Sequence, residues 1–275
     1  MDKPEYLYHY TSLETLALIL ENRTICFNSL LNVDDIEESE TSDLKNFGKY
    51  VYVSCWTDEE DEMIPMWNLY TPDMHGVRIK LLAFPFEKYM YKAGEFNFKN
   101  DCESYIDYRK VFEDNRGATV SNMPQLVPVC YTDEEEKLNP RVRIKGTAED
   151  AQNFISGNYA HVEVTYSLTE LGRNKRKVWE FQKEWRYLLW FTPMGLREAK
   201  NGTIKTHQEF IRRMEDPKQK PPYERFFLKL RRDAIEQMEV VFGPRMSEAE
   251  RILAKALLHK HGLDGRWRNS GLKIR

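Results

Sequence analysis

The chain has 275 residues, of which 41% are hydrophobic and 31% charged, with a formal net charge of -3 and a mean hydropathy of -0.67. This composition predicts one large or two small water-soluble domains with a substantial core. It excludes a membrane-spanning protein, because no run approaches the roughly 18 apolar residues that a spanning helix needs.

The N-terminal sequence and the cysteines predict a cytoplasmic protein. The first residues, MDKPEY, lack the basic and apolar regions of a signal peptide. The four cysteines show neither CxxC spacing nor a pairing with histidine, so we expect free thiols and no zinc site.

The predicted elements begin with a strand over residues 7–10 and a helix whose capping box is Thr11-Ser12-Leu13-Glu14. Composition and alternation predict further strands over residues 24–27, 50–56, 76–83, 126–131, 161–166, 185–191, 225–230, 239–242 and 271–274. Helices are predicted over residues 62–70, 104–112, 133–138, 148–155, 178–183 and 247–261. The acidic segments 34–40, 58–62 and 133–136 read as solvated loops.

Many short strands and few helices indicate an α+β fold rather than a doubly wound sheet. No glycine-rich turn joins a strand to a helix, which excludes the dinucleotide fingerprint and the P-loop. We expect a single domain over residues 1–275, and leave open a helical insertion at about residues 85–160.

Charge is uneven along the chain. Residues 197–275 contain 19 lysines and arginines against 11 aspartates and glutamates. Such an excess binds a phosphate backbone or covers the solvated faces of helices, and both interpretations remain open.

Several kinds of catalytic site have weak support. No GxSxG is present, and Cys55 has no identifiable partner, so a packing role is expected for this thiol. Asp34, Asp35, Glu37 and Glu38 are potential magnesium ligands, as in a metal-dependent nuclease, but their spacing is unorganised.

Three short motifs remain. They are YHYT around His9, SCW at 54–56 with MWNLY at 66–70, and KEWR at 183–186. Each has a structural explanation, namely an aromatic core strand, an apolar helix face, and a Glu184–Arg186 ion pair that offsets carboxylate burial.

Together these motifs resemble a known family. The order YHYTS, an N-D-E loop, S-x-W, MWxxY with HGV, and KEWR, followed by VVFGPRMSEAE, is similar to a family of uncharacterised bacterial proteins. That family resembles the ADP-ribosyltransferase-fold toxins of phage-defence toxin–antitoxin systems. The resemblance implies a split β-sandwich with flanking helices and a nicotinamide cleft between its sheets.

The resemblance also implies residue roles. His9 and Glu184 would be catalytic, with His9 on the ribose 2'-hydroxyl and backbone groups at Tyr10 and Thr11 on the carboxamide. Ser54 matches the second motif, which gives an H-S-E pattern that departs from the two familiar ones. The nicotinamide would lie against the rings of Trp56, Trp67 or Tyr70.

The implied activity is transfer of ADP-ribose from NAD, as a substrate, to a nucleic acid or a protein. Oxocarbenium-like charge in the transition state needs a fixed carboxylate and no metal. The basic C-terminal third, residues 197–275, favours RNA over DNA or protein as the acceptor, with Arg266 and Arg268 contacting phosphates and Trp267 stacking on a base. An ordinary surface strand would explain the same three residues. A neutralising antitoxin protein is expected as a partner, and no membrane. The alternative is a non-catalytic binding or interaction module of a defence system.

Overall fold

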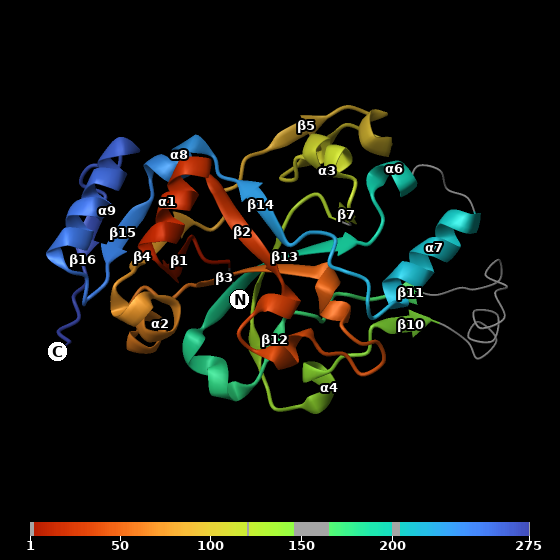
Figure 1. Cartoon of the computed structure of the whole chain (residues 1–275), viewed down its shortest axis with the longest axis horizontal. Helices are drawn as coiled ribbons and strands as arrows, with labels where there is room; N and C mark the ends of the chain where they lie inside the picture. Colours follow the sequence, from red (N-terminus) through yellow and green to blue (C-terminus); the bar gives the residue numbers. More distant parts are fainter. Residues whose placement is uncertain (1–2, 120, 146–164, 200–203, 275) are drawn as a thin grey trace.

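The computed structural model describes residues 3–119, 121–145, 165–199 and 204–274 (Figure 1). It has the predicted α+β class, with one ten-stranded sheet, three two-stranded sheets and surrounding helices. Within the described ranges, no helix combines the length and apolar character required to span a membrane.

The large sheet consists of β1 (Tyr6–Thr11), β2 (Thr24–Ser29), β3 (Val51–Thr57), β4 (Val77–Leu82), β7 (Ala118–Thr119), β8 (Gln125–Pro128), β13 (Glu184–Thr192), β14 (Arg225–Lys229), β15 (Glu239–Phe242) and β16 (Trp267–Asn269). The small sheets pair β5 (Tyr89–Tyr91) with β6 (Cys102–Ser104), β9 (Cys130–Tyr131) with β12 (Asn174–Lys175), and β10 (Arg143–Lys145) with β11 (Thr165–Tyr166).

The α-helices are α1 (Leu13–Asn22), α2 (Ile64–Tyr70), α3 (Tyr108–Asp114), α4 (Glu135–Leu138), α6 (Leu196–Ala199), α7 (Ile204–Glu215), α8 (Arg232–Glu236) and α9 (Glu248–Lys260). The 3-10 helices are η1 (Leu30–Asn32), η2 (Ile36–Ser39), η3 (Phe47–Tyr50), η4 (Pro72–Met74), η5 (Glu95–Asn97) and η7 (Lys177–Gln182).

The large sheet forks at β3. One edge of β3 pairs antiparallel with β13 from Val51 to Thr57. The other edge is shared, because β2 pairs with Tyr52 and Val53 while β1 pairs only with Thr57. Among the described strands, none pairs with residues 54–56 on that edge, and helix α1 connects the two diverging strands.

Strand β13 is the centre of the fold. It pairs with β3 on one edge and with β7 and β8 on the other. Its residues from Glu184 to Phe191 are all buried, as the apolar run WRYLLWF predicts. The hydroxyl of Tyr187 donates to the Ala83 carbonyl 2.5 Å away, which satisfies a polar group inside the aromatic core.

The predicted elements that differ from the structure include the start of α1 and the C-terminal strand. Helix α1 is capped by Ser12, whose hydroxyl accepts from the Thr15 amide at 3.2 Å, whereas Thr11 is the last residue of β1. Residues 271–274 form no strand; the C-terminal strand is β16, and Leu272 and Ile274 instead pack beside Trp67. The helix predicted over residues 247–261 is present as α9, and it begins with a capping box at Ser247.

The segment at 85–160 is mixed in its described part. It contains α3 and α4, but also β7 and β8, which join the main sheet through β13. The helix predicted over 148–155 lies outside the described residues, as does most of the strand predicted over 161–166.

The acidic segment 34–40 is not simply a solvated loop. It forms η2 and buries Glu38, which is only 4% exposed, together with Asp35. Two buried cations, Lys175 and Arg186, bind the Glu38 carboxylate and offset the loss of water.

Candidate functional site

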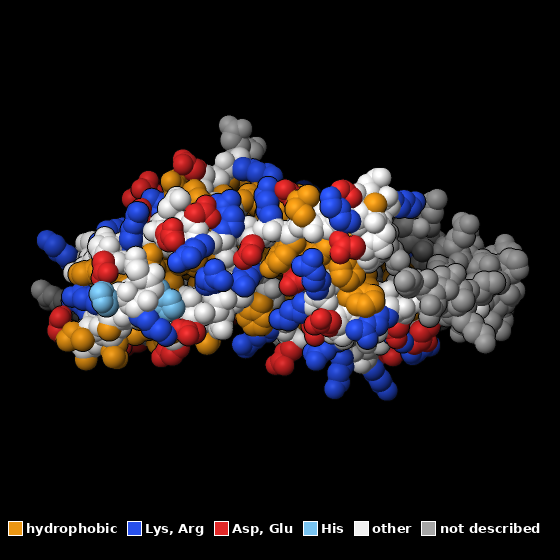
Figure 2. All heavy atoms as spheres, turned by 90° about the horizontal axis from the view of Figure 1, so that it is seen from above, with side chains coloured by type: hydrophobic (Ala, Val, Ile, Leu, Met, Phe, Trp, Pro, Cys, Tyr) orange, Lys and Arg blue, Asp and Glu red, His pale blue; other side chains and the backbone are white. Residues whose placement is uncertain are grey.

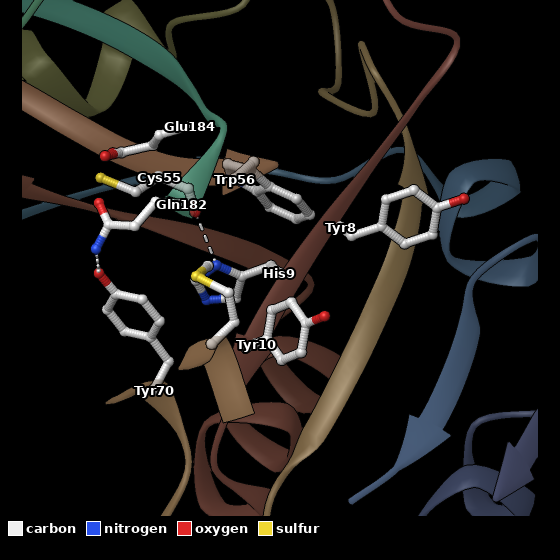
Figure 3. A pocket seen from close by; sticks show the side chains of 9 residues that line it. Tyr8, His9, Tyr10, Cys55, Trp56, Tyr70, Gln182 and Glu184 are labelled. Carbon is white, nitrogen blue, oxygen red and sulfur yellow. Dashed lines mark hydrogen bonds between the residues drawn. The ribbon is translucent and has the colours of Figure 1, made fainter. Parts of the chain in front are cut away.

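A pocket lies at the fork of the sheet (Figure 3). Its lining comes from β1, β3, α2, the end of η7 and the start of β13, and consists of Tyr8, His9, Tyr10, Cys55, Trp56, Met66, Tyr70, Gln182 and Glu184. The two predicted catalytic residues, His9 and Glu184, therefore line one pocket although they are far apart in the sequence.

His9 bridges the fork. Its Nδ1 lies 2.8 Å from the Cys55 carbonyl oxygen, within the stretch 54–56 of β3 that no described strand pairs with on this edge (Figure 3). A carbonyl only accepts, so Nδ1 carries the proton and donates it. Burial lowers the pKa of His9, although the bond to Cys55 acts in the opposite direction. The ring is therefore neutral near pH 7, with Nε2 as a hydrogen-bond acceptor.

Aromatic rings form much of the wall. The ring centroid of Trp56 lies 5.0 Å from that of His9, and the indole Nε1 donates to the Ser54 hydroxyl at 3.0 Å. The ring of Tyr10 packs edge-on against Trp67, and its hydroxyl accepts from the Met63 amide at 3.0 Å. These polar atoms already have internal partners, so the rings present mainly apolar surface to the pocket.

Glu184 belongs to a buried cluster of four charges. Arg186 binds its carboxylate through Nε at 2.5 Å and through the second terminal nitrogen at 3.0 Å. Lys175 Nζ lies 3.3 Å from Glu184 Oε2 and 3.2 Å from Glu38 Oε1, and Arg186 also binds Glu38. Two cations thus balance two anions, which is the condition under which buried charge is tolerated.

The cluster keeps Glu184 ionised. Burial raises the pKa of this carboxyl, but Arg186 and Lys175 more than offset that effect and lower the pKa to about 2. The carboxylate therefore stays negative throughout the physiological range. A fixed negative charge beside an aromatic pocket stabilises positive charge that develops in a bound molecule.

The small sheet of β9 and β12 supports Glu184 from one side. The Tyr131 hydroxyl on β9 accepts from the Glu184 amide at 2.8 Å. On β12, the strand paired with β9, Lys175 binds the Glu184 side chain. Backbone and carboxylate are thus both fixed by one element, which limits the freedom of Glu184 at the mouth of β13.

Gln182 connects the carboxylate side of the pocket to α2. Its amide oxygen accepts from Lys175 Nζ at 2.8 Å, and its amide nitrogen donates to the Tyr70 hydroxyl at 2.6 Å (Figure 3). Gln182 is 1% exposed, so both bonds are shielded from water.

The predicted site residues divide into two groups. His9, Tyr10, Trp56, Tyr70 and Glu184 line the pocket. The other three predicted residues on the NAD side, Thr11, Ser54 and Trp67, are buried outside its lining. Trp67 belongs to the core cluster behind Tyr10 and Met66, and Ser54 accepts from the Trp56 indole.

Cys55 lines the pocket, whereas the sequence indicated only a packing role. It stands opposite Arg186 in the pairing of β3 with β13. Burial first, and then the Glu184 charge, raise the pKa of its thiol well above the ordinary value. Cys55 is therefore a protonated thiol here and not an activated nucleophile.

The basic triplet lies elsewhere, at the start of β16. The ring of Trp267 stacks on that of Phe242, with 5.1 Å between the ring centroids. Lys255 Nζ lies 4.6 Å from the centroid of the Trp267 ring. Arg266 is exposed, and Arg268 pairs with Glu62 at 3.0 Å. On the face seen in Figure 2, basic and acidic side chains are interspersed.

No group of three or more histidine, cysteine, aspartate or glutamate side chains suited to a metal occurs in the described part of the chain. In the segment predicted as potential magnesium ligands, Glu38 binds Lys175 and Arg186, and Glu37 binds Arg176.

Sequence reasoning missed Gln182 and Lys175 as parts of the site, and it identified Glu38 only as a potential magnesium ligand. Lys175 stands in the basic run RNKRK and Glu38 in an acidic run, where the surrounding charges indicate solvated positions. Only the pairing of β12 with β9 and the turn of η2 bring these two charges inside. Gln182 stands two positions before Glu184, and that proximity was the available signal.

A family model described as "Protein of unknown function (DUF2971)" matches residues 66–187. The matched region includes Met66, Tyr70, Gln182 and Glu184 of the pocket, but not His9. No curated protein and no solved structure matches the chain.

Proposed function

We propose that this chain is an NAD-dependent ADP-ribosyltransferase of the toxin-like kind, acting in the cytoplasm in phage defence. The observation that carries the proposal is the convergence of His9 and Glu184 on one aromatic pocket at the fork of the sheet. A forked sheet also supports the split β-sandwich that the resemblance implies.

The proposed reaction breaks the bond between nicotinamide and ribose C1'. Nicotinamide leaves with the electron pair, and an acceptor oxygen or nitrogen attacks C1' and releases its proton. The Glu184 carboxylate would stabilise the oxocarbenium-like charge on the ribose. His9 Nε2 would accept one hydrogen bond from the nicotinamide riboside part of NAD, and Trp56 and Tyr70 would flank the leaving ring.

The proposed acceptor is RNA, with DNA or a protein as the other candidates. Arg266 and the excess of basic residues after position 196 support a phosphate-bearing acceptor. A toxin of this kind requires a neutralising protein partner, so an antitoxin is part of the proposal.

The experiment uses NAD labelled in its adenylate part, with cellular RNA, DNA or lysate protein as acceptors, and measures both nicotinamide release and label transfer. Glu184→Gln removes the charge that lines the pocket. Glu38→Gln is the matched control, because Glu38 binds the same Arg186 and Lys175 but does not line the pocket.

We expect Glu184→Gln to lower turnover by at least about 100-fold, the scale of losing one electrostatic stabiliser. Glu38→Gln should lower the stability of the protein about as much as Glu184→Gln does, but it should retain far more turnover than Glu184→Gln. No NAD cleavage by the wild type with any acceptor would reject the transferase.

A non-catalytic binding module is the second candidate. The observation that favours it is that both oxygens of Glu184 already bind Arg186 or Lys175, which leaves the carboxylate charge largely neutralised. This candidate predicts nucleotide binding without nicotinamide release, and equal effects of the Glu184 and Glu38 substitutions.

A further inference from the structure

Three side chains form a directional chain of hydrogen bonds that ends in the pocket. Lys175 Nζ lies 2.8 Å from Gln182 Oε1, and Gln182 Nε2 lies 2.6 Å from the Tyr70 hydroxyl. An ammonium group has only donors, so the amide oxygen of Gln182 must face Lys175. The amide nitrogen, a donor, is thereby forced to face Tyr70.

This order determines what Tyr70 offers a ligand. Its oxygen accepts from Gln182, so its own proton is free of that bond. Burial, followed by the nearby Glu184 charge, raises the pKa of Tyr70, so the proton is retained at all ordinary pH values. Tyr70 is therefore a hydrogen-bond donor to the pocket.

His9 has the opposite polarity. Its Nδ1–H donates to the Cys55 carbonyl, and this leaves Nε2 as an acceptor. Tyr70 and His9 both line the pocket and extend from different elements, α2 and β1 (Figure 3). One donor and one acceptor, each fixed by an internal partner, thus flank the same space.

We propose that the pocket is specific for a planar ring bearing a primary carboxamide, whose oxygen accepts from Tyr70 and whose nitrogen donates to His9, and that Lys175 is the positioning residue that sets this polarity. The choice of a nicotinamide-like ring rests on the proposed function. The polarity itself follows from the hydrogen bonds alone.

Two probes separate the two bonds. Nicotinamide and 3-acetylpyridine share the ring and the carbonyl acceptor, but a methyl group replaces the amide nitrogen in 3-acetylpyridine. We expect the wild type to bind nicotinamide about tenfold more tightly in calorimetry, the effect of one buried hydrogen bond. His9→Leu should abolish this preference.

Gln182→Glu tests the polarity of Tyr70. The carboxylate has nearly the same shape but only accepts, so it takes the Tyr70 proton as well as the Lys175 bond. In Gln182→Glu, the affinity for both probes should fall about tenfold, as it should in Tyr70→Phe, although the Tyr70 hydroxyl is still present. Gln125→Glu, on the exposed part of β8, adds the same charge as a control and should leave both affinities unchanged.

Lys175 is tested by a double-mutant cycle. In Lys175→Met the orientation of Gln182 is no longer fixed, so adding Tyr70→Phe should change probe affinity less than twofold. Lys175→Arg retains the donors and should restore the full effect of Tyr70→Phe. A purely structural role of Lys175 would leave the effect of Tyr70→Phe the same in all backgrounds.

Equal binding of the two probes by the wild type, no binding of nicotinamide, or wild-type affinity in Gln182→Glu would each overturn the inference. These measurements need no turnover. If the protein discriminates between the probes but does not cleave NAD, the proposed hydrogen-bond polarity is supported and the transferase is rejected. If it cleaves NAD but does not discriminate, the transferase is supported and the polarity is rejected.

Discussion

Arg186 and Glu184 stand two positions apart on β13 and point to the same side of the sheet, where the guanidinium binds the carboxylate through two nitrogens at 2.5 and 3.0 Å. Neither residue is more than 5% exposed. The pair thus combines bidentate geometry with exclusion of water, the arrangement in which each charge depends most on the other.

Replacing Arg186 should be among the most destabilising single changes. Arg186→Met leaves Glu38 and Glu184 buried with Lys175 as the remaining cation of the cluster, so we expect a loss of about 3–5 kcal/mol in the free energy of unfolding. Urea denaturation measures it. Arg141→Met, at an exposed arginine, is the control and should stay within about 0.5 kcal/mol. If Arg186→Met lowered the free energy of unfolding by less than about 1 kcal/mol, the four charges would not form an interdependent buried cluster.

His9 should make stability depend on pH. Its pKa is lowered in the folded state by burial, so below pH 6.5 the unfolded chain binds a proton that the folded chain does not. The free energy of unfolding should therefore fall by about 1 kcal/mol from pH 7 to pH 5 through this group. His9→Gln should remove that component. An identical pH dependence in both proteins would show that His9 is not buried as a neutral ring.

Glu62 should hold the C-terminal segment against α2. Its side chain accepts from the Ser270 hydroxyl at 2.5 Å, from the Gly271 amide at 3.0 Å and from Arg268 at 3.0 Å. Glu62→Gln weakens these charge-assisted bonds, so we expect a loss of about 1–2 kcal/mol and faster hydrogen exchange over residues 270–274. Glu239→Gln is the control because that carboxylate is half exposed. Unchanged exchange over 270–274 would reject this role.

The proposed RNA acceptor gives a further prediction. If Arg266 contacts a phosphate, Arg266→Ala should reduce the slope of log K against log salt concentration by about 1. Fluorescence anisotropy with a labelled RNA measures the slope. Arg141→Ala lies outside the basic third and serves as the control. The same slope in the wild type and both variants would exclude Arg266 from the interface.

The parts of the fold with strong local patterns were predictable. The run WRYLLWF indicates a buried strand because every position of β13 except the last is covered on both faces. The capping box at Ser247 marks the start of α9 for the same kind of local reason. The fork was not predictable from local patterns, because it depends on which residues of β3 pair with β1 and which with β2.

The site was predictable only through resemblance. His9 and Glu184 each have an ordinary structural explanation in the sequence, and only long-range strand pairing brings them to one pocket. Lys175 and Glu38 were unpredictable for a different reason. A charged residue within a charged run gives no sign that it is buried. For Glu38, the free-energy cost of burying the carboxylate is offset by Lys175 and Arg186, which are more than 130 positions away in the sequence.

The fork has a mechanical consequence. Strands β1 and β2 both pair with the same edge of β3, and the ten-residue helix α1 connects them in the chain. The helix therefore links the two strands that border the fork. Because α1 contributes no residue to the pocket lining, altering its length should change the separation of β1 and β2 at the fork and leave the lining side chains as they are.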